Sequence, residues 1–336
     1  MTKKSRGAAL TLGAVLTVFM LLICVCIGSV SIPLKTTLTV IWRGIFGLEI
    51  PAGMYKSIIL SVRLPRVLCV ALSGAALSLC GAAMQGLLRN PLADGSTMGV
   101  STGAALGAVL ALAFGESLPL NTTAMAIVFA FFSLLLILLL AYTLDKSLST
   151  GTIILIGVVF SMFASSLINL VITFAGEKVK SITFWSMGSL AGSTYKDALL
   201  LLAALILCAI PLLNMSNELN AFAIGEDNAR QIGINIRAVK LTVLITVSIL
   251  IGVCVSVGGT IGFVGLIIPH ITRAVTGPNH KRLLPASLLS GACFLMLADL
   301  LSRTLLSPLE LPIGVITSLI GSVVFVVIFF KKRRRG

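Results

Sequence analysis

Residues 241–272, LTVLITVSILIGVCVSVGGTIGFVGLIIPHIT, form an uncharged run of 32 residues. One membrane crossing takes about 20 apolar residues, so this run is too long for a single helix through a bilayer. Its second half is interrupted by four glycines, namely Gly258, Gly259, Gly262 and Gly265. Because glycine weakens a helix, we expect the chain to break there. The run therefore predicts two crossings, and the second, at about residues 262–274, is short.

The remainder of the chain contains eight more uncharged runs, at residues 7–34, 67–88, 95–115, 117–144, 147–176, 198–217, 283–298 and 311–330. The whole chain of 336 residues is 57% hydrophobic and 11% charged, against roughly a quarter charged in a globular domain. This composition excludes a soluble fold and a disordered chain. Unbroken apolar runs also exclude an outer-membrane barrel, whose strands alternate. We predict an all-α polytopic membrane protein with a single transmembrane domain over residues 1–336.

The distribution of lysine and arginine supports ten crossings. The chain starts with Lys3, Lys4 and Arg6 and carries five basic residues at 331–335. Ten crossings place 16 of the 25 basic residues inside and 9 outside, whereas nine crossings give 9 inside and 16 outside. Since cytoplasmic loops are rich in lysine and arginine, ten is preferred. Both termini are then cytoplasmic, in a multi-pass protein of the cytoplasmic (inner) membrane, and the first run is a retained crossing and not a cleaved signal peptide.

Small residues recur at helical spacing in two of the runs. Gly74, Ser78, Ala82 and Gly86 follow one another every four residues, and so do Gly95, Gly99, Gly103 and Gly107. Small side chains let helix backbones approach closely in a membrane. We expect both helices to pack tightly against neighbours.

The remaining composition excludes several kinds of site. The net charge of +14 is spread between apolar runs, a pattern typical of loop charges and not of a nucleic-acid surface. The seven cysteines form no C-x-x-C pair and the chain has two histidines, so we expect neither a metal site nor a bound cofactor. Acidic residues lie at the ends of the runs and no phosphate-binding loop is present, which argues against ion-coupled transport and against nucleotide hydrolysis by this chain. A transport protein of this kind needs an energy-supplying partner, or it is a channel.

The longest predicted cytoplasmic loop, at about residues 215–239, is the candidate contact for such a partner. Ser216 or Asn217 is expected to cap a short helix that runs through Phe222. Gly225 breaks that helix, and residues 226–232 form a second turn closed by Gly233. The alternative is an ordinary connector at the membrane surface.

Five segments carry a resemblance to a known family. They are RLPRVLCVALSGAALSLCGAAMQGLLRNPLADGSTMGVSTGAALG at 63–107, LSTGTIILIGV at 148–158, AIGEDNARQIGI at 223–234, GTIGFVGLIIPHITR at 259–273 and LADLLSRTLLSPLELPIGVITSLIGS at 297–322. In this order they resemble the FecCD-type permeases, the membrane subunits of ABC importers for iron-siderophores, haem and vitamin B12. One departure is Gly95, where many relatives carry proline.

The resemblance implies a type II ABC importer permease fold with ten transmembrane helices in the lipid bilayer. It implies two permease subunits, identical or paralogous, two cytoplasmic ATP-binding subunits that hydrolyse ATP, and an extracytoplasmic substrate-binding protein. The chain is then a transport subunit and not an enzyme. An iron(III)-siderophore is the expected substrate, with haem and cobalamin as alternatives. Two alternatives from other functional classes are a gated channel without an ATPase and a membrane anchor for an enzyme complex.

The resemblance also implies three groups of site residues. The first group contacts the ATPase and consists of Glu218, Phe222, Gly225, Glu226, Ala229, Ile232 and Gly233. The second forms the cytoplasmic gate and consists of Asn90, Leu92, Ser149 and Thr150; these residue types suit turns and helix caps equally well. The third docks the binding protein and consists of Arg63, Arg66 and Arg303. The alternative for the third group is that Arg63 and Arg66 reach lipid headgroups and Arg303 pairs with Asp299.

Overall fold

The computed structural model describes residues 3–28, 30, 32–49, 54–95, 98–115, 121–146 and 148–333. Regular structure in these residues consists of helices, with one isolated bridge between Leu306 and Leu309. The predicted all-α class is confirmed. The first half contains α1 (Lys3–Cys26), α2 (Leu34–Ile45), α3 (Met54–Ser57), a π-helical turn (Ile58–Arg63), α4 (Leu64–Leu87), α5 (Val100–Phe114), α6 (Thr122–Leu144) and α7 (Thr150–Phe174). The second half contains a 3-10 turn (Gly176–Lys178), α8 (Val179–Ser186), α9 (Tyr195–Asn214), α10 (Ser216–Ile224), α11 (Glu226–Gln231), α12 (Ile236–Gly258), α13 (Val264–Thr276), α14 (His280–Thr304) and α15 (Ile313–Arg333).

Six of these helical segments are long and apolar enough to cross a membrane: Tyr55–Leu87, Thr122–Leu144, Thr150–Phe174, Tyr195–Asn214, Ile236–Gly258 and His280–Thr304. Four shorter apolar segments accompany them, at Thr11–Cys26, Val100–Phe114, Val264–Thr276 and Ile313–Val327. Each of the ten predicted crossings overlaps one of these segments. The helices are therefore compatible with ten crossings, and that number stays a prediction.

The glycine-rich stretch after α12 breaks the helix as predicted. The helix ends at Gly258, and Gly259 follows with a φ of +67°. Phe263, with a φ of +68°, precedes α13, which has 13 residues. The short second segment thus begins two residues later than expected. The run at 7–34 also differs from its expected single helix, because α1 ends at Cys26 and α2 is a separate amphipathic helix.

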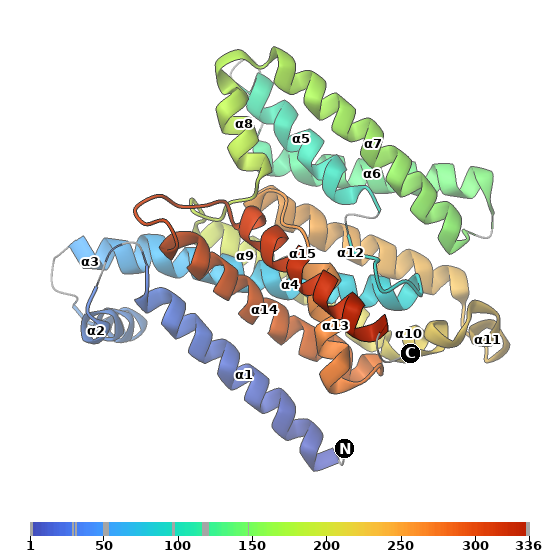
Figure 1. Cartoon of the computed structure of the whole chain (residues 1–336), viewed down its shortest axis with the longest axis horizontal. Coiled ribbons are helices and arrows are strands. Elements are labelled where there is room, and N and C mark those ends of the chain that lie inside the picture. The colour runs from blue at the N-terminus through green and yellow to red at the C-terminus, as the bar shows by residue number, and fades with distance from the viewer. Residues whose placement is uncertain are drawn as a thin grey trace.

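Figure 1 shows how the helices are arranged. The helices α5 to α8 lie together beside the group formed by α4, α9 and α12 to α15, and α1 packs against α14 and α4. The start of α1, the end of α15 and the helices α10 and α11 lie toward one end of the molecule. The helices α2 and α3 lie toward the opposite end.

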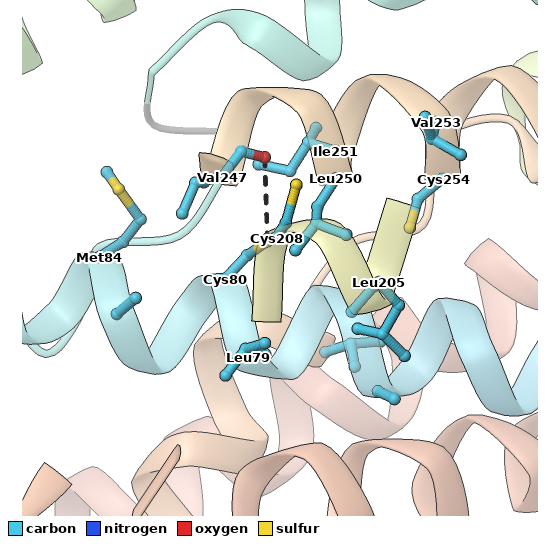
Figure 2. Packing of buried hydrophobic residues seen from close by; sticks show 14 of the residues in the cluster. Leu79, Cys80, Met84, Leu205, Cys208, Val247, Leu250, Ile251, Val253 and Cys254 are labelled. Atoms are coloured by element: carbon cyan, nitrogen blue, oxygen red, sulfur yellow. Dashed lines mark hydrogen bonds between the residues drawn. The ribbon is translucent and has the colours of Figure 1, made fainter. Parts of the chain in front are cut away.

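The centre of the structure is built on α4 and α12. In the segment that contains α4, 78% of the most apolar stretch is buried inside the protein. The corresponding share is 72% for α12 and 28% for α7. Figure 2 shows Cys80 of α4 facing Val247 and Leu250 of α12, with Leu205 of α9 beside them. These two helices are therefore surrounded by protein and form the core.

The small-residue face of α4 permits backbone contact with two neighbours. A Cβ atom built on Gly81 would lie 1.8 Å from the carbonyl oxygen of Gly265 in α13. One built on Gly74 would lie 2.4 Å from the carbonyl oxygen of Gly291 in α14. Both distances are too short for any side chain, so the predicted tight packing of this helix is confirmed.

Candidate functional site

The loop that follows α9 forms two short helices, α10 and α11, separated by one glycine. Gly225 has a φ of +154° and a ψ of 147°, a conformation that suits glycine. Gly233, with a φ of +87°, lies two residues after α11. The predicted pair of helices is confirmed. The predicted cap is wrong. Ser216 is already helical, and Met215, which precedes it with a φ of −81° and a ψ of 15°, makes no side-chain cap. Only this residue separates α9 from α10, so there is no room for a capping residue in an extended conformation.

The residues predicted to contact the ATPase divide into an inward set and an outward set. Phe222 and Ala229 are fully buried within the chain; α10, which contains Phe222, packs against α4 and α14, and α11, which contains Ala229, packs against α10 and α12. Ile232 is 71% exposed, and Ile224, at the end of α10, is also exposed. Glu218 lies in the first turn of α10. The inward residues hold the loop on the membrane helices, and the exposed isoleucines are the apolar groups available to a partner.

The first attachment of this loop joins α10 to the start of α14. The Asn220 Oδ1 atom accepts a hydrogen bond of 2.8 Å from the backbone N–H of His280 and lies 2.9 Å from its Nδ1 atom. The Asn220 Nδ2 atom donates to Asn279 Oδ1 at 3.3 Å. These bonds fix α10 against α14.

The second attachment joins α11 to the start of α7. The Glu226 Oε1 atom accepts a hydrogen bond of 3.2 Å from the Thr150 hydroxyl group. The Glu226 Oε2 atom forms an ion pair of 2.8 Å with Lys240 Nζ of α12. A residue predicted to contact the ATPase therefore touches a residue predicted to form the gate.

The other predicted gate segment approaches the same place. A Cβ atom built on Gly225 would lie 3.9 Å from the Arg89 Nη1 atom, and Arg89 directly precedes Asn90. The hinge between α10 and α11 thus lies beside the end of α4 and beside the start of α7.

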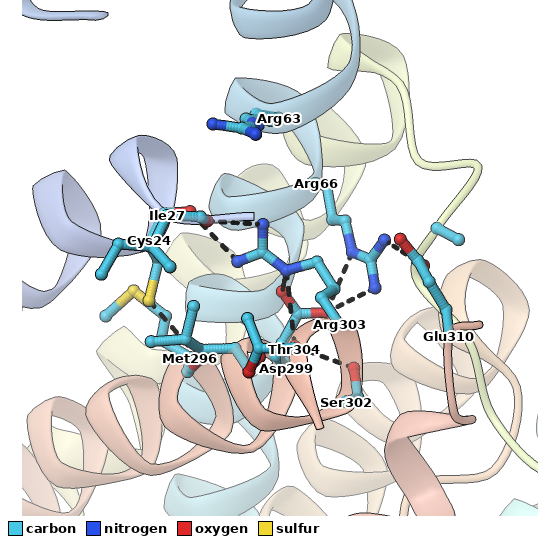
Figure 3. A network of polar contacts seen from close by, with 12 residues as sticks. Cys24, Ile27, Arg63, Arg66, Met296, Asp299, Ser302, Arg303, Thr304 and Glu310 are labelled. Carbon is cyan, nitrogen blue, oxygen red and sulfur yellow. Dashed lines mark hydrogen bonds and ion pairs between the residues drawn. The ribbon is translucent and has the colours of Figure 1, made fainter. Parts of the chain in front are cut away.

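At the opposite end, the three predicted docking arginines lie near one another, as Figure 3 shows; Arg66 and Arg303 share Asp299, whereas Arg63 is bonded elsewhere. Arg66 donates to Asp299 Oδ1 at 2.9 Å and to Glu310 Oε2 at 2.7 Å. Arg303 is 3.0 Å from the other oxygen of Asp299, so the pair named as the alternative to docking is present. All three arginines and Asp299 are buried.

Two of these arginines also hold the end of α1. Arg63 donates to the carbonyl oxygens of Val25 at 3.2 Å and Cys26 at 2.9 Å, and also bonds that of Val30. Arg303 donates to the carbonyl oxygens of Cys24 and Ile27 at 3.1 and 3.2 Å. Because the last carbonyls of a helix lack intrahelical partners, arginine bonds satisfy them. The alternative was that Arg63 and Arg66 reach lipid headgroups; in this structure Arg63 bonds backbone oxygens and Arg66 bonds Asp299 and Glu310.

Comparison with known proteins identifies the family. A sequence profile of the FecCD transport family matches residues 16–331. The chain belongs to the FecCD transport family. It is 42% identical to the ABC transporter permease protein YvrB of Bacillus subtilis, over 99% of this chain and 96% of the relative. It is 37% identical to the molybdate import system permease protein MolB of Haemophilus influenzae, over 92% of this chain and 91% of the relative.

A solved structure agrees with this assignment. The FecCD chain matches an ABC transporter assigned to the metal-chelate type, in an inward-facing conformation, with a TM-score of 0.85 and 34% identity. The match covers 97% of this chain and 99% of that chain. Other relatives of this FecCD protein are named for import of hemin, iron chelatin and vitamin B12. The protein is a permease of an ABC importer, and its fold is that of such permeases.

The predicted gate residues of this FecCD permease have local structural roles. The Asn90 Oδ1 atom accepts from the backbone N–H of Leu92 at 2.9 Å, and the Ser149 side chain caps α7 by accepting from Thr152. These are the turn and cap roles that the residue types suit. Leu92 is exposed. Gate function of the four residues stays a prediction.

Three residues that bear on these sites were not identified from the sequence. Ile224 lies at the end of α10 and signals nothing beyond its hydrophobicity. Glu310 lies within the family-like segment 297–322 and has no spacing that links it to Arg66, although the two form an ion pair. Lys240 precedes a long apolar run and reads as an ordinary loop charge, yet its side chain is 1% exposed.

Proposed function

We propose that this FecCD permease translocates an iron(III)-siderophore across the cytoplasmic membrane. Cytoplasmic ATP-binding subunits drive the transport, an extracytoplasmic binding protein delivers the substrate, and a second permease subunit, identical or paralogous, completes the path. The main support for contact with an ATPase subunit is the pair of short helices α10 and α11. These helices carry the exposed residues Ile224 and Ile232 and lie next to the predicted gate. Apolar groups on a helical projection suit a groove on a partner.

The proposed substrate rests on the relatives. Probable iron chelatin permeases from Helicobacter pylori are 39% identical to this chain, and the solved structure is assigned to the metal-chelate type. Haem and cobalamin are the alternatives within the family. Molybdate is a further candidate because the relative named for it matches over 92% of this chain.

The proposed orientation places both termini and α10 and α11 in the cytoplasm. The start of α1, the end of α15 and the two short helices lie toward the same end of the molecule, which supports this orientation. The excess of lysine and arginine in the loops assigned to that side points the same way. Asn90, Leu92, Ser149 and Thr150 then lie at the cytoplasmic mouth, where we place the gate.

The test of this function is reconstitution with its partner subunits. The permease, purified with an ATPase subunit, should import radioactive iron held by a hydroxamate siderophore into proteoliposomes, only with ATP and the binding protein. The variant Ile232→Arg should lose the ATPase subunit, since an unpaired charge at a buried contact costs about 3 kcal/mol or more, roughly a hundredfold in affinity. Leu309→Arg, at a residue that is equally 71% exposed at the other end, is the matched control. Import of hemin, cobalamin or molybdate alone would replace the proposed substrate, and an ATPase subunit retained by Ile232→Arg would contradict the proposed contact.

We also propose that the binding protein docks at Arg63, Arg66 and Arg303. Of their carboxylate partners, Glu310 is the accessible one, with a side chain that is 34% exposed, whereas that of Asp299 is 1% exposed. A carboxylate of the binding protein would take the place of Glu310 on Arg66, because a guanidinium group suits a bidentate carboxylate.

Glu310→Gln should therefore strengthen docking by removing the competing charge. Exposed pairs are worth about 0.2 to 1 kcal/mol, so affinity should rise by up to about fivefold. Surface plasmon resonance on permease in nanodiscs measures this affinity at low and at high salt. Glu177→Gln, which removes another exposed acidic group, is the control, and weaker binding by Glu310→Gln would count against docking on Arg66.

A further inference from the structure

Lys240 is a buried charged residue in the second turn of α12. Its side chain is 1% exposed, which is rare for lysine unless the ammonium group is paired. The Nζ atom is 2.8 Å from Glu226 Oε2 and donates to the backbone carbonyl oxygen of Leu148 at 2.8 Å. One ammonium group therefore bonds both α11 and the turn that precedes α7.

Glu226 connects the same two elements through its other oxygen. Its Oε1 atom accepts from the Thr150 hydroxyl group at 3.2 Å. The carboxylate thus lies between Lys240 and Thr150 and contacts both. Charge-assisted hydrogen bonds of this kind are roughly twice as strong as neutral ones, so α11 is firmly attached here.

The start of α7 is built as one unit with the end of α6. The Asp145 Oδ2 atom accepts from the backbone N–H of Ser149 at 3.0 Å and from the Thr152 hydroxyl group at 3.4 Å. The hydroxyl groups of Ser149 and Thr152 are 2.8 Å apart. A displacement applied at Leu148 or Thr150 therefore moves this end of α7 as a whole.

The backbone at Leu148 is held in an unfavourable conformation. Its φ is +51°, in the left-handed region that leucine rarely adopts. Such a residue persists where surrounding contacts hold it, and its own carbonyl oxygen is the one bonded by Lys240.

The two short helices of the loop are attached to different parts of the membrane domain. Asn220 ties α10 to α14, whereas Glu226 ties α11 to α7 and α12. Gly225 separates them and has a backbone conformation that suits glycine. Movement of α11 relative to α10 is therefore passed on to α7 and not to α14.

We propose that Lys240, with Glu226 and Thr150, is the link that transmits movement of the ATPase contact to the cytoplasmic end of α7. Lys240 acts as a positioning residue, since it touches neither the substrate nor ATP. This role rests on the proposed function, because it needs an ATPase that moves α11. Lys240 holds Glu226 and Leu148 at a fixed separation, so that α11 and the start of α7 shift together.

The test compares Lys240→Met with Arg237→Met in the reconstituted complex. Methionine keeps the length of the lysine stem and removes its charge. Arg237 lies almost one turn earlier on α12, is exposed and lies over the Tyr142 ring at 5.1 Å, so it controls for charge lost at the same helix end. We expect Lys240→Met to keep its ATPase subunit and its ATP hydrolysis, and to lower the number of substrates imported per ATP by about tenfold, within the usual range of coupling between sites. Arg237→Met should keep the wild-type ratio.

A second variant and a spectroscopic measurement separate transmission from folding. Glu226→Gln, at a side chain that is 22% exposed, should lower the same ratio, and adding it to Lys240→Met should change little, because residues that act as a unit are not additive. A fluorophore on Gly151→Cys reports on the start of α7; a Cβ atom there meets nothing within 4 Å among the described residues. Its emission should change with nucleotide in the parent protein and not in Lys240→Met.

The outcomes distinguish this link from the proposed function. If the parent protein binds no ATPase subunit, the proposed function fails. If the parent imports substrate with ATP and Lys240→Met does so with an unchanged ratio and an unchanged nucleotide response at position 151, the link is overturned.

Discussion

Replacing Asp299 by alanine should lower the free energy of unfolding of the permease by about 3 to 5 kcal/mol, the usual cost of removing one partner from a buried ion pair. Asp299 is 1% exposed and bonds Arg66 through one oxygen and Arg303 through the other. Without it, two buried guanidinium groups face each other and lose their shared counter-ion. The loss also loosens the end of α1, because Arg303 donates hydrogen bonds to the backbone carbonyl oxygens at that end of the helix.

Thermal unfolding of the detergent-purified protein, followed by circular dichroism, measures this loss. Glu310→Gln is the matched control, since it removes the more exposed partner of Arg66 and should cost less than about 1 kcal/mol. If Asp299→Ala is as stable as the Glu310→Gln control, the arginines find other partners and Asp299 is dispensable for stability.

Replacing Gly81 by alanine should destabilise the fold by a similar amount, because the new methyl group meets backbone. Its Cβ atom would lie 1.8 Å from the carbonyl oxygen of Gly265 and 2.5 Å from the Gly265 Cα atom. Backbone atoms of a helix cannot turn aside as a flexible side chain does, so α4 and α13 must separate. Overpacking of a core typically costs about 1 to 3 kcal/mol, and this contact belongs at or above the upper end.

Gly262→Ala is the control for this prediction. Gly262 lies three residues before Gly265, and a Cβ atom there meets nothing within 4 Å among the described residues. Fluorescence-detected size-exclusion chromatography after heating compares the two variants. A Gly81→Ala protein that survives the same temperature as Gly262→Ala would mean that the helices are packed less closely than the structure has them.

The membrane helices were predictable because their signal is local. The run at 241–272 contains both the excess length and the glycines that break it, and the structure breaks at Gly258 and Gly259. By contrast, α2 and α8 have 12 and 8 residues and carry charges, so hydrophobicity alone assigns them to loops. Their helical state depends on the surroundings that long apolar neighbours provide.

The candidate site was predictable only in its local part. Gly225 and Gly233 mark the boundaries of α11 within a few residues, and the structure follows them. The partner of Lys240 on α11 lies 14 residues away, and its partner before α7 lies 92 residues away. No spacing rule in one sequence pairs such residues, and the carbonyl oxygens that Arg63 bonds have no sequence signature at all.

The ion network at the start of α4 also constrains how the protein is made. Arg66 and Asp299 are 233 residues apart in the chain, so at about 5 to 20 residues per second the arginine is synthesised about 12 to 47 s before its counter-ion. Until α14 emerges from the ribosome, Arg66 lacks its partner Asp299, and an unpaired arginine is costly inside a bilayer. The helix α4 is central in the finished protein, and we therefore expect its start to become fixed only after α14 has been made. Chains that terminate before α14 are therefore expected to be degraded by membrane proteases, whereas chains that lack only residues after 310 should retain α4 in place.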